Sequence, residues 1–265
     1  MNILVCVKQV PDTTEIKIDP ITNTLIRAGV PSIVNPFDAY ALELALRIKE
    51  TNGGTITVLS MGPEQAKNAL RQCLSVGADK AILLSDRAFG GSDTLASSYI
   101  LSTAIKAIED KTEKFDLIFC GKQAIDGDTG QVGPEIAEHL GYPQVTYASD
   151  ITVDGKNIRV KRENEDHSEI IEAQIPTVIT VIKTAYEPRY ATIKSKLAAN
   201  KVQISTMTSD DLDIDLERIG LKGSPTKVKK TFTPQLKKAG VKIKGETGSE
   251  SALKLISLLS DAGLI

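Results

Sequence analysis

The sequence predicts an α/β fold: a doubly wound, mostly parallel sheet in three layers, followed by a carboxyl-terminal extended arm and a terminal helix. Four short apolar runs, each followed by a segment with apolar residues at helical spacing, alternate over the first half of the chain. Such alternation is typical of parallel strands joined by right-handed helical crossovers. The runs are continuously apolar, which indicates strands that are buried on both faces.

The first strand is expected at residues 2–8, and its following loop leaves the sheet at the edge where ligands usually bind. Residues 15–30 alternate polar and apolar side chains around turn-forming residues, which predicts a small hairpin. A helix is then expected to begin at Asn35, a preferred N-cap, with Pro36 in its first turn. Asp38 lies where the helix dipole favours a negative charge.

The next two strands are expected at residues 55–61 and 81–84, with a helix between them that ends at Gly77. Ser92 is the predicted N-cap of a further helix that reaches about residue 109. The inward face of that helix is expected to carry Leu95, Tyr99, Thr103 and Ile108.

The stretch from Phe115 to Gly141 combines a predicted strand, a polar loop rich in glycine and a predicted amphipathic helix. A loop between the carboxyl end of a strand and the amino end of a helix is where open α/β sheets bind nucleotides, because free N–H groups and the helix dipole favour phosphate. Neither GxGxxG nor the P-loop pattern is present, so the kind of nucleotide stays open. A surface turn rich in Asp is the alternative.

After residue 142 the pattern changes to short alternating segments, which predict a β-hairpin insertion at about residues 145–175. Residues 177–182 form a strongly β-forming run that is expected to return to the sheet. Residues 191–200 are expected to form a short helix or an exposed loop. The predicted α/β domain therefore covers residues 1–200.

Residues 201–265 are expected to form an arm and a helix that pack on a partner subunit. The segment from 201 to about 245 is polar and offers no evident core. Residues 249–262 place Leu253, Ile256 and Leu259 on one face of an amphipathic helix. A helix that folds back on its own domain is the alternative.

The composition is that of an ordinary soluble globular chain of 265 residues, with 41% hydrophobic and 25% charged residues. A net charge of -2 gives no indication of nucleic-acid binding. No apolar run is long enough to span a membrane, and no signal peptide is evident, so a cytoplasmic location is expected. The three cysteines lack metal-ligand spacing and are expected to be buried free thiols.

No catalytic constellation or metal site is predicted. His139 and His167 have no nucleophile or second ligand at a recognisable spacing and are expected to be solvated surface residues. Asp126 and Asp128 have the chemistry for acid–base work or for binding magnesium, although turn formation is the commoner role of aspartate in such a loop. If the protein carries out a reaction, a bound cofactor must supply the chemistry.

The chain resembles the beta subunits of electron transfer flavoproteins. The matching motifs follow the family order over most of the first 200 residues: VKQVPDT at 7–13, NPFDAYALELAL at 35–46, LRQCLSVGADKAIL at 70–83, GKQAIDGDTGQVGPEIAEHLG at 121–141 and EPRYATI at 187–193. This resemblance implies the same doubly wound fold and a carboxyl-terminal arm that embraces an alpha subunit.

The resemblance also implies the residues that bind a nucleotide. They belong to the first strand, the Asn35–Asp38 segment, the end of the strand at 55–61 and the loop after residue 120. The implied residues are Cys6, Asn35, Pro36, Phe37, Asp38, Met61, Gly121, Lys122, Gln123, Ala124, Ile125, Asp126, Gly127, Asp128, Thr129, Gly130, Gln131 and Val132.

The family holds one of two nucleotides at this place. One branch binds structural AMP, and the other binds a second FAD that accepts hydride from NADH and bifurcates the electrons. Here the segment QVPDT after Lys8 and the loop sequence GDTGQVGP resemble the bifurcating branch. Gly127 and Gly130 leave room beside the phosphates. FAD is therefore the favoured cofactor, and AMP is the alternative.

The resemblance implies the electron partners as well. One electron goes to ferredoxin or flavodoxin, and the other passes through the FAD of the alpha subunit to an acyl-CoA dehydrogenase. The segment 191–200 matches the docking loop for the dehydrogenase, with Ile193 as the apolar anchor and Leu197 as a second candidate. Packing of Ile193 on its own domain is the alternative.

Two other classes of protein are alternatives to an electron transfer flavoprotein subunit. A stand-alone, universal-stress-type adenine-nucleotide-binding protein has a similar sheet, but it has neither the long arm nor the EPRYAT motif. An ATP-pyrophosphatase-type enzyme requires an SGGxDS loop, which the chain does not contain.

Overall fold

The computed structural model describes residues 1–12, 31–229 and 240–265. The chain divides into two compact units, one of which reaches Lys229 while the other contains the carboxyl-terminal helix. The hairpin predicted at residues 15–30 lies outside the described residues.

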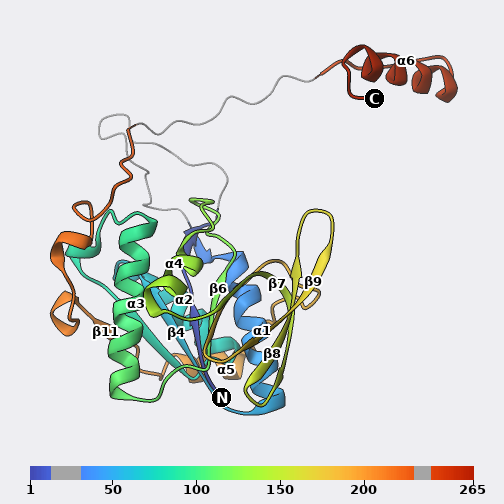
Figure 1. Cartoon of the computed structure of the whole chain (residues 1–265). Helices are drawn as coiled ribbons and strands as arrows, with labels where there is room; N and C mark the ends of the chain where they lie inside the picture. The colour runs from blue at the N-terminus through green and yellow to red at the C-terminus, as the bar shows by residue number, and fades with distance from the viewer. Residues whose placement is uncertain (13–30, 230–239) are drawn as a thin grey trace. The chain divides into compact units, whose positions relative to one another are not determined.

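The first unit is built on one nine-stranded sheet with the order β11-β5-β4-β1-β6-β10-β7-β8-β9 (Figure 1). The strands are β1 (Asn2–Cys6), β4 (Thr55–Met61), β5 (Lys80–Leu84), β6 (Leu117–Gly121), β7 (Gln144–Asp154), β8 (Asn157–Glu163), β9 (Ser168–Gln174), β10 (Thr177–Val181) and β11 (Ser205–Met207). From β11 to β7 all neighbours are parallel, and β8 and β9 add antiparallel strands. The predicted mostly parallel sheet is confirmed.

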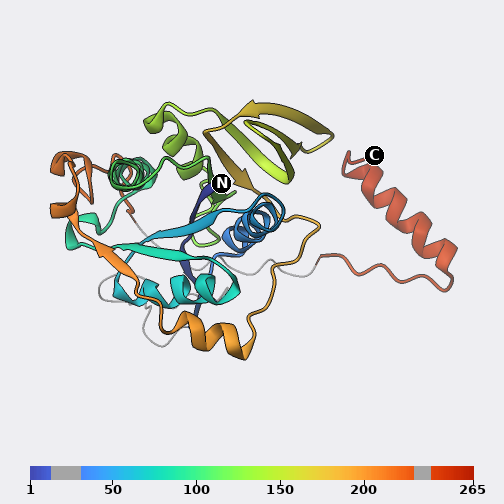
Figure 2. The same cartoon turned by 90° about the horizontal axis from the view of Figure 1, so that it is seen from below.

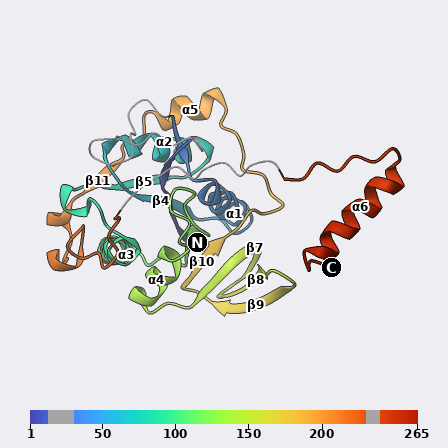
Figure 3. The same ribbon diagram turned by 90° about the horizontal axis from the view of Figure 1, so that it is seen from above.

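Helices cover both faces of the sheet and give the three expected layers (Figure 3). They are α1 (Pro36–Asn52), α2 (Lys67–Val76), α3 (Thr94–Lys111), α4 (Val132–Leu140) and α5 (Ile193–Ala199). In β1, Ile3 and Val5 pack in the core under α1 and α2, whereas Leu4 and Cys6 pack in the core under α3 and α4. The strand is apolar on both faces because both faces are covered.

The order in which the chain adds strands to the sheet reverses at β1. From β1 the chain proceeds to β4 and β5 on one side, and then it crosses back to β6 on the other side. The carboxyl ends of β1 and β6 therefore lie next to each other while their connections diverge. In doubly wound sheets such a switch point opens a crevice in which ligands bind.

Helix α3 differs from the expectation in its first turn. Its N-cap is Asp93, whose side chain accepts a 3.1 Å hydrogen bond from the Ala96 N–H, and not Ser92. The Ser92 hydroxyl donates to the Phe89 carbonyl instead. On the same helix Leu95, expected to face inward, is exposed, while Ile100, Ile105 and the expected Ile108 are buried. The sequence pattern alone did not show which of the two adjacent residues, Ser92 or Asp93, caps α3.

The region predicted as a β-hairpin insertion forms an antiparallel ladder of β7, β8 and β9, in which β7 is one strand of eleven residues (Figure 1). The register between β7 and β8 shifts between Ala148 and Asp150. A bulge at this point lets β7 continue as one strand. As predicted, residues 177–181 return to the sheet as β10, between β6 and β7.

The compact unit continues beyond the boundary expected at residue 200. β11 pairs in parallel with β5 at the edge of the sheet. Leu212 and Ile219 are buried in the core beneath α3. The unit ends at Lys229, so the first part of the expected arm belongs to the α/β unit. These apolar residues are spaced too irregularly to produce a periodic signal.

The second unit contains the predicted terminal helix, α6 (Gly248–Asp261). Thr247 is its N-cap and accepts a hydrogen bond from the Glu250 N–H. Leu253, Ile256 and Leu258 are exposed. Within the part of the chain that the structure describes, no helix is both long and apolar enough to cross a bilayer.

Candidate functional site

The candidate site lies at the switch point, where β1 and β6 end side by side. Cys6 and Cys120 are register partners on these two strands. The loop from Gly121 to Gln131 leaves β6 here and leads into α4, whose first-turn N–H groups have no acceptor within the helix. The predicted nucleotide loop therefore lies where the sheet topology opens a ligand crevice.

Asp38 links the end of β1 to the start of the loop that follows β6. Its carboxylate accepts hydrogen bonds from the backbone N–H groups of Lys8 (2.7 Å) and Gly121 (3.1 Å) and from the amide of Asn35 (2.9 Å). The side chain is buried, and burial raises its pKa to about 7, while these hydrogen bonds act in the opposite direction. One buried carboxylate thus fixes the strand ends of both β1 and β6.

Asn35 supports the loop and does not cap the helix with its side chain. Its amide nitrogen donates 2.8 Å to the Gln123 carbonyl, and its amide oxygen accepts 3.1 Å from the Ile125 N–H. Asn35 is fully buried. The predicted N-cap position is correct, but the side chain binds a loop about ninety residues away.

Two glycines of the site are required by close packing. A Cβ on Gly121 would overlap Asp38 Oδ1 and lie 2.8 Å from the backbone of Phe37. A Cβ on Gly133 would lie 2.5 Å from the Thr180 methyl group. Gly133 therefore lets α4 approach the sheet. By contrast, open space surrounds Gly127, which is free to accept a side chain.

The loop is held by its own polar side chains. Lys8 pairs with Asp126 over 2.7 Å, and the Gln123 amide donates 2.8 Å to Asp128. Asp128 has a left-handed backbone with φ 53, which aspartate tolerates better than most residues. The Thr94 hydroxyl donates 2.9 Å to Gln131 and so connects α3 to the loop.

A cavity of about 450 Å³ lies above these groups and is called the loop cavity here. Its lining combines apolar side chains from the strand ends with the backbone of the loop and the first turns of α3 and α4. It is lined by Cys6, Val7, Lys8, Asp38, Leu59, Met61, Ser92, Asp93, Thr94, Ser97, Leu101, Cys120, Gly121, Lys122, Gln123, Ala124, Gly127, Thr129, Gly130, Gln131, Val132, Gly133 and Thr226. Its size is in the range of small-molecule and cofactor sites.

A second cavity of about 880 Å³ adjoins the first and is called the α2 cavity. It extends across the ends of β4 and β5 to the segment before α2. Both cavities are lined by Lys8, Met61, Ser92 and Ser97. Together they form one cleft along the carboxyl ends of four neighbouring strands, β5, β4, β1 and β6.

The structure brings together most of the predicted nucleotide-binding residues, but it gives five of them other positions. Twelve of the eighteen line the loop cavity, and Asp126 lines the α2 cavity. The five that line neither cavity are Asn35, Pro36, Phe37, Ile125 and Asp128. Asn35 and Asp128 support the loop from behind, while Pro36 is exposed and Phe37 half-buried.

Sequence reasoning missed the contribution of α3 and of the carboxyl-terminal segment. Asp93, Thr94 and Ser97 line the loop cavity from the start of α3. A capped helix that begins after a strand is a recognisable signal, and it could have included them. Thr226 lines the same cavity because its N–H donates 2.9 Å to Asp93. No local pattern in the sequence indicates that contact.

The two histidines have different surroundings. His167 lies in an exposed turn, where hydrogen bonds from its ring to the carboxylates of Asp166 and Glu169 raise its pKa. His139, expected on the surface, is half-buried with its ring 5.9 Å from the ring of Tyr99. Burial lowers the pKa of His139, and the positive charge of Arg218 acts in the same direction.

The segment that matches the docking loop forms the short helix α5, which packs against α2 (Figure 2). Its N-cap is Thr192, whose hydroxyl accepts 3.1 Å from the Ser195 N–H. Ile193 is 81% exposed and Leu197 is 61% exposed. The alternative in which Ile193 packs on its own domain is therefore wrong for this structure.

The model of the electron transfer flavoprotein domain matches residues 22–212, which cover most of the chain and all of the loop at the switch point. The chain belongs to the electron transfer flavoprotein family. This match agrees with the resemblance found in the sequence. The matched residues include most strands and helices of the nine-stranded α/β unit.

Full-length relatives place the family member among beta subunits. The chain is 54% identical over 256 residues to the electron transfer flavoprotein subunit beta of Megasphaera elsdenii, covering 96% of this chain and 95% of that protein. It is 51% identical over 261 residues to the subunit beta of Clostridium acetobutylicum, covering 98% of each. It is also 49% identical over 266 residues to the caffeyl-CoA reductase-Etf complex subunit CarD of Acetobacterium woodii, covering all of both chains.

Proposed function

We propose that this beta subunit pairs with an electron transfer flavoprotein alpha subunit and binds FAD at the switch point. The observation that carries the choice of FAD is that the loop cavity and the α2 cavity adjoin and share four lining residues. An adenylate group alone fills only one of these spaces. A dinucleotide with a flavin ring at its other end uses both.

The residues of the cleft are suited to FAD. The loop cavity has an apolar floor of Leu59, Leu101 and Cys120, on which a flat ring can lie. Phosphates would be held by the N–H groups at the start of α4, with positive charge supplied by Lys8, which lines both cavities. The chain supplies the binding groups, and bound FAD supplies the two-electron chemistry toward hydride.

The polypeptide itself holds the loop that would orient the cofactor. Asp38 and Asn35 contact the loop backbone at three positions, and Asp38 also binds the Lys8 N–H at the end of β1. Lys8, which lines both cavities, pairs with Asp126, which lines the α2 cavity. We assign no general acid or base to the chain, in keeping with hydride chemistry that requires none from the protein.

NADH is the proposed electron donor, with ferredoxin or flavodoxin as one acceptor. The other electron is proposed to pass through the FAD of the alpha subunit to an acyl-CoA dehydrogenase. For this second route α5 provides the docking surface, since Ile193 and Leu197 project from it as exposed apolar side chains. A small apolar anchor of this kind suits a transient contact. The relative from Acetobacterium woodii, named as part of a caffeyl-CoA reductase complex, supports this assignment.

AMP is the alternative nucleotide. Its support is that the loop cavity alone, with a volume of about 450 Å³, provides an adenine pocket and the phosphate-binding start of α4. In that case the α2 cavity has no role in binding the cofactor, and the subunit carries electrons without oxidising NADH.

The decisive experiment is a cofactor count. The chain is co-expressed with its alpha subunit, and the nucleotides of the purified complex are released and quantified. Two FAD per heterodimer, with NADH bleaching the flavin absorption, support the proposal. One FAD and one AMP per heterodimer, with no response to NADH, establish the alternative. An absence of any adenine-containing ligand beyond the FAD of the alpha subunit overturns both.

A further inference from the structure

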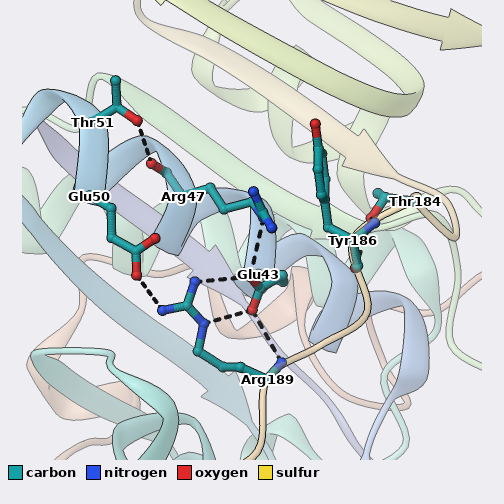
Figure 4. Close-up of polar contacts among 7 residues, drawn as sticks. All are labelled: Glu43, Arg47, Glu50, Thr51, Thr184, Tyr186 and Arg189. Carbon is teal, nitrogen blue, oxygen red and sulfur yellow. Dashed lines mark hydrogen bonds and ion pairs between the residues drawn. The ribbon is translucent and has the colours of Figure 1, made fainter.

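One face of helix α1 carries a row of polar side chains that bind the loop leading to α5. Tyr40, Glu43, Arg47 and Glu50 recur at intervals of three or four residues and so share this face. Figure 4 shows Glu43, Arg47 and Glu50 directed toward Arg189 and Tyr186 of the loop. The loop contains most of the EPRYATI motif, and residues 187–192 of that motif line neither cavity.

Arg189 is the centre of this contact. Its Nε and Nη2 donate to the two oxygens of Glu43 over 2.8 Å and 2.9 Å, which is the two-pronged geometry that only arginine provides. The backbone N–H of Arg189 donates to the same carboxylate over 3.2 Å, and Nη1 donates to Glu50. These hydrogen bonds raise the pKa of Arg189 and lower the pKa of Glu50.

Glu43 is almost fully buried, with a side-chain exposure of 5%. A buried carboxylate is costly unless it is paired, so Glu43 holds Arg189 strongly in place. Arg47 lies 3.4 Å from Glu43 and stacks over the ring of Tyr186 at 3.8 Å. The loop is therefore fixed to α1 by charge, by hydrogen bonds and by a cation–π contact.

The other end of α5 is fixed to a different helix. The guanidinium of Arg71 on α2 donates 2.7 Å to the carbonyl of Ala199 and 3.1 Å to the carbonyl of Val202. Between the two arginine contacts, Tyr190 and Ile193 are 97% and 81% exposed. The segment that carries these exposed side chains is therefore held at its start by the Arg189–Glu43 contact and at its end by Arg71.

Helix α1 also begins at the nucleotide cleft, where Asn35 and Asp38 hold the loop after β6. We propose that Arg189 is a positioning residue for docking, because it fastens the start of α5 to the helix whose first turn builds the cofactor site. Asp38 and Glu43 are five residues apart on this helix, about 7.5 Å along its axis. Helix α1 therefore contacts both the loop of the nucleotide cleft, through Asp38, and the segment that leads to α5, through Glu43.

This inference rests on the proposed docking role of α5, and two readouts separate them. The first is amide hydrogen exchange of residues 190–199 in the purified heterodimer without any dehydrogenase. The second is the KM for an acyl-CoA dehydrogenase in electron transfer. Arg189→Met is expected to increase both the exchange rate and the KM by at least about tenfold, with cofactor content and exchange of β1 and β6 unchanged.

Two further variants keep the test decisive. Arg189→Lys retains a charge beside Glu43, so it folds even if Arg189→Met does not, and it is expected to give an intermediate increase because lysine lacks the two-pronged geometry. Arg159→Met is the matched control. It removes a 2.8 Å arginine–glutamate pair with Glu172 on the exposed strands β8 and β9, and it is expected to change neither readout.

The outcomes distinguish the two ideas. Unchanged exchange at residues 190–199 in both Arg189 variants overturns the positioning role, whatever happens to the KM. If exchange increases and Ile193→Ala raises the KM while Arg189→Met does not, positioning for docking is overturned and the docking surface itself is supported. If Ile193→Ala also leaves the KM unchanged, the proposed docking function fails, and the inference about docking fails with it.

Discussion

The backbone N–H of Gly121 donates a 3.1 Å hydrogen bond to Oδ1 of Asp38, a residue that precedes it by 83 positions. The same carboxylate accepts from the Lys8 N–H at the end of β1. The ends of the two strands that form the switch point are therefore joined through one side chain from α1. This contact leaves no space for a side chain on the Gly121 Cα. A larger residue at this position would have to move the backbone that lines the loop cavity.

Gly121→Ala is expected to destabilise the protein and empty the nucleotide site. The added Cβ would overlap Asp38 Oδ1, and relief of such overpacking costs ~1–3 kcal/mol. Thermal unfolding and cofactor content measure the two effects. Gly127→Ala is the matched control, since no atom lies within 4 Å of its added Cβ. Equal behaviour of the two variants would contradict the close packing at Gly121.

Asp38→Asn is expected to change the pH dependence of stability. The pKa of Asp38 is raised from 3.8 to about 7, so the folded state retains a proton that the unfolded state releases over this range. The contribution of the wild-type carboxyl is therefore largest below pH 3.8 and is lost as pH rises through about 7, by on the order of 4 kcal/mol. Urea unfolding across this range should show wild type losing stability relative to Asp38→Asn as pH rises. Parallel curves for the two proteins would refute the raised pKa.

Asp128→Ala is expected to release the nucleotide and leave the sheet folded. The substitution removes the 2.8 Å bond from Gln123, and alanine is disfavoured at φ 53 by about 1–2 kcal/mol. Asp128 does not line either cavity, so the loss would act through the shape of the loop. Cofactor content and far-UV circular dichroism test this. Asp128→Asn preserves an acceptor and tolerates the left-handed backbone, so it should retain the cofactor.

Gly127→Leu is expected to reduce nucleotide binding without loss of fold. Gly127 lines the loop cavity, and no protein atom lies within 4 Å of an added Cβ, so a large side chain there is expected to compete with a bound ligand without displacing protein atoms. The expected result is at least about tenfold weaker nucleotide binding, a difference of 1.4 kcal/mol, with unchanged unfolding temperature. Nucleotide titration of the emptied complex would show this. Full affinity in Gly127→Leu would exclude the ligand from this part of the cavity.

Ile193→Ala is expected to slow electron delivery to the dehydrogenase and to spare cofactor content. An apolar anchor that is 81% exposed contributes to binding a partner and little to folding. The rate of dehydrogenase-coupled electron transfer is the measurement. Ile170→Ala is a suitable comparison, because Ile170 is 65% exposed on β9, away from α5. An unchanged rate in Ile193→Ala would show that α5 is not the docking surface.

Local signals in the sequence were sufficient for the core of the fold. The apolar run at residues 117–120 and the amphipathic segment ending at Gly141 predicted β6 and α4 because burial and helical spacing are short-range properties. They failed where neighbouring residues offered equivalent choices. Ser92 and Asp93 are both good caps, and only the structure shows that Asp93 is the N-cap of α3. Likewise, β11 was not predicted from its own three residues and is defined by its pairing with β5.

The sequence by itself determined the alternation of strands and helices in the first half of the chain, the position of the glycine-bearing loop and the family to which the chain belongs. Only the tertiary structure decided that Asn35 serves the loop, that Thr226 reaches the cavity and that Arg189 is fastened to Glu43. The reason is distance along the chain. Arg189 and Glu43 are separated by 146 positions, so no local preference of either residue specifies their contact. Such contacts arise when the sheet brings its helices and loops together, and the cleft and the docking helix depend on them.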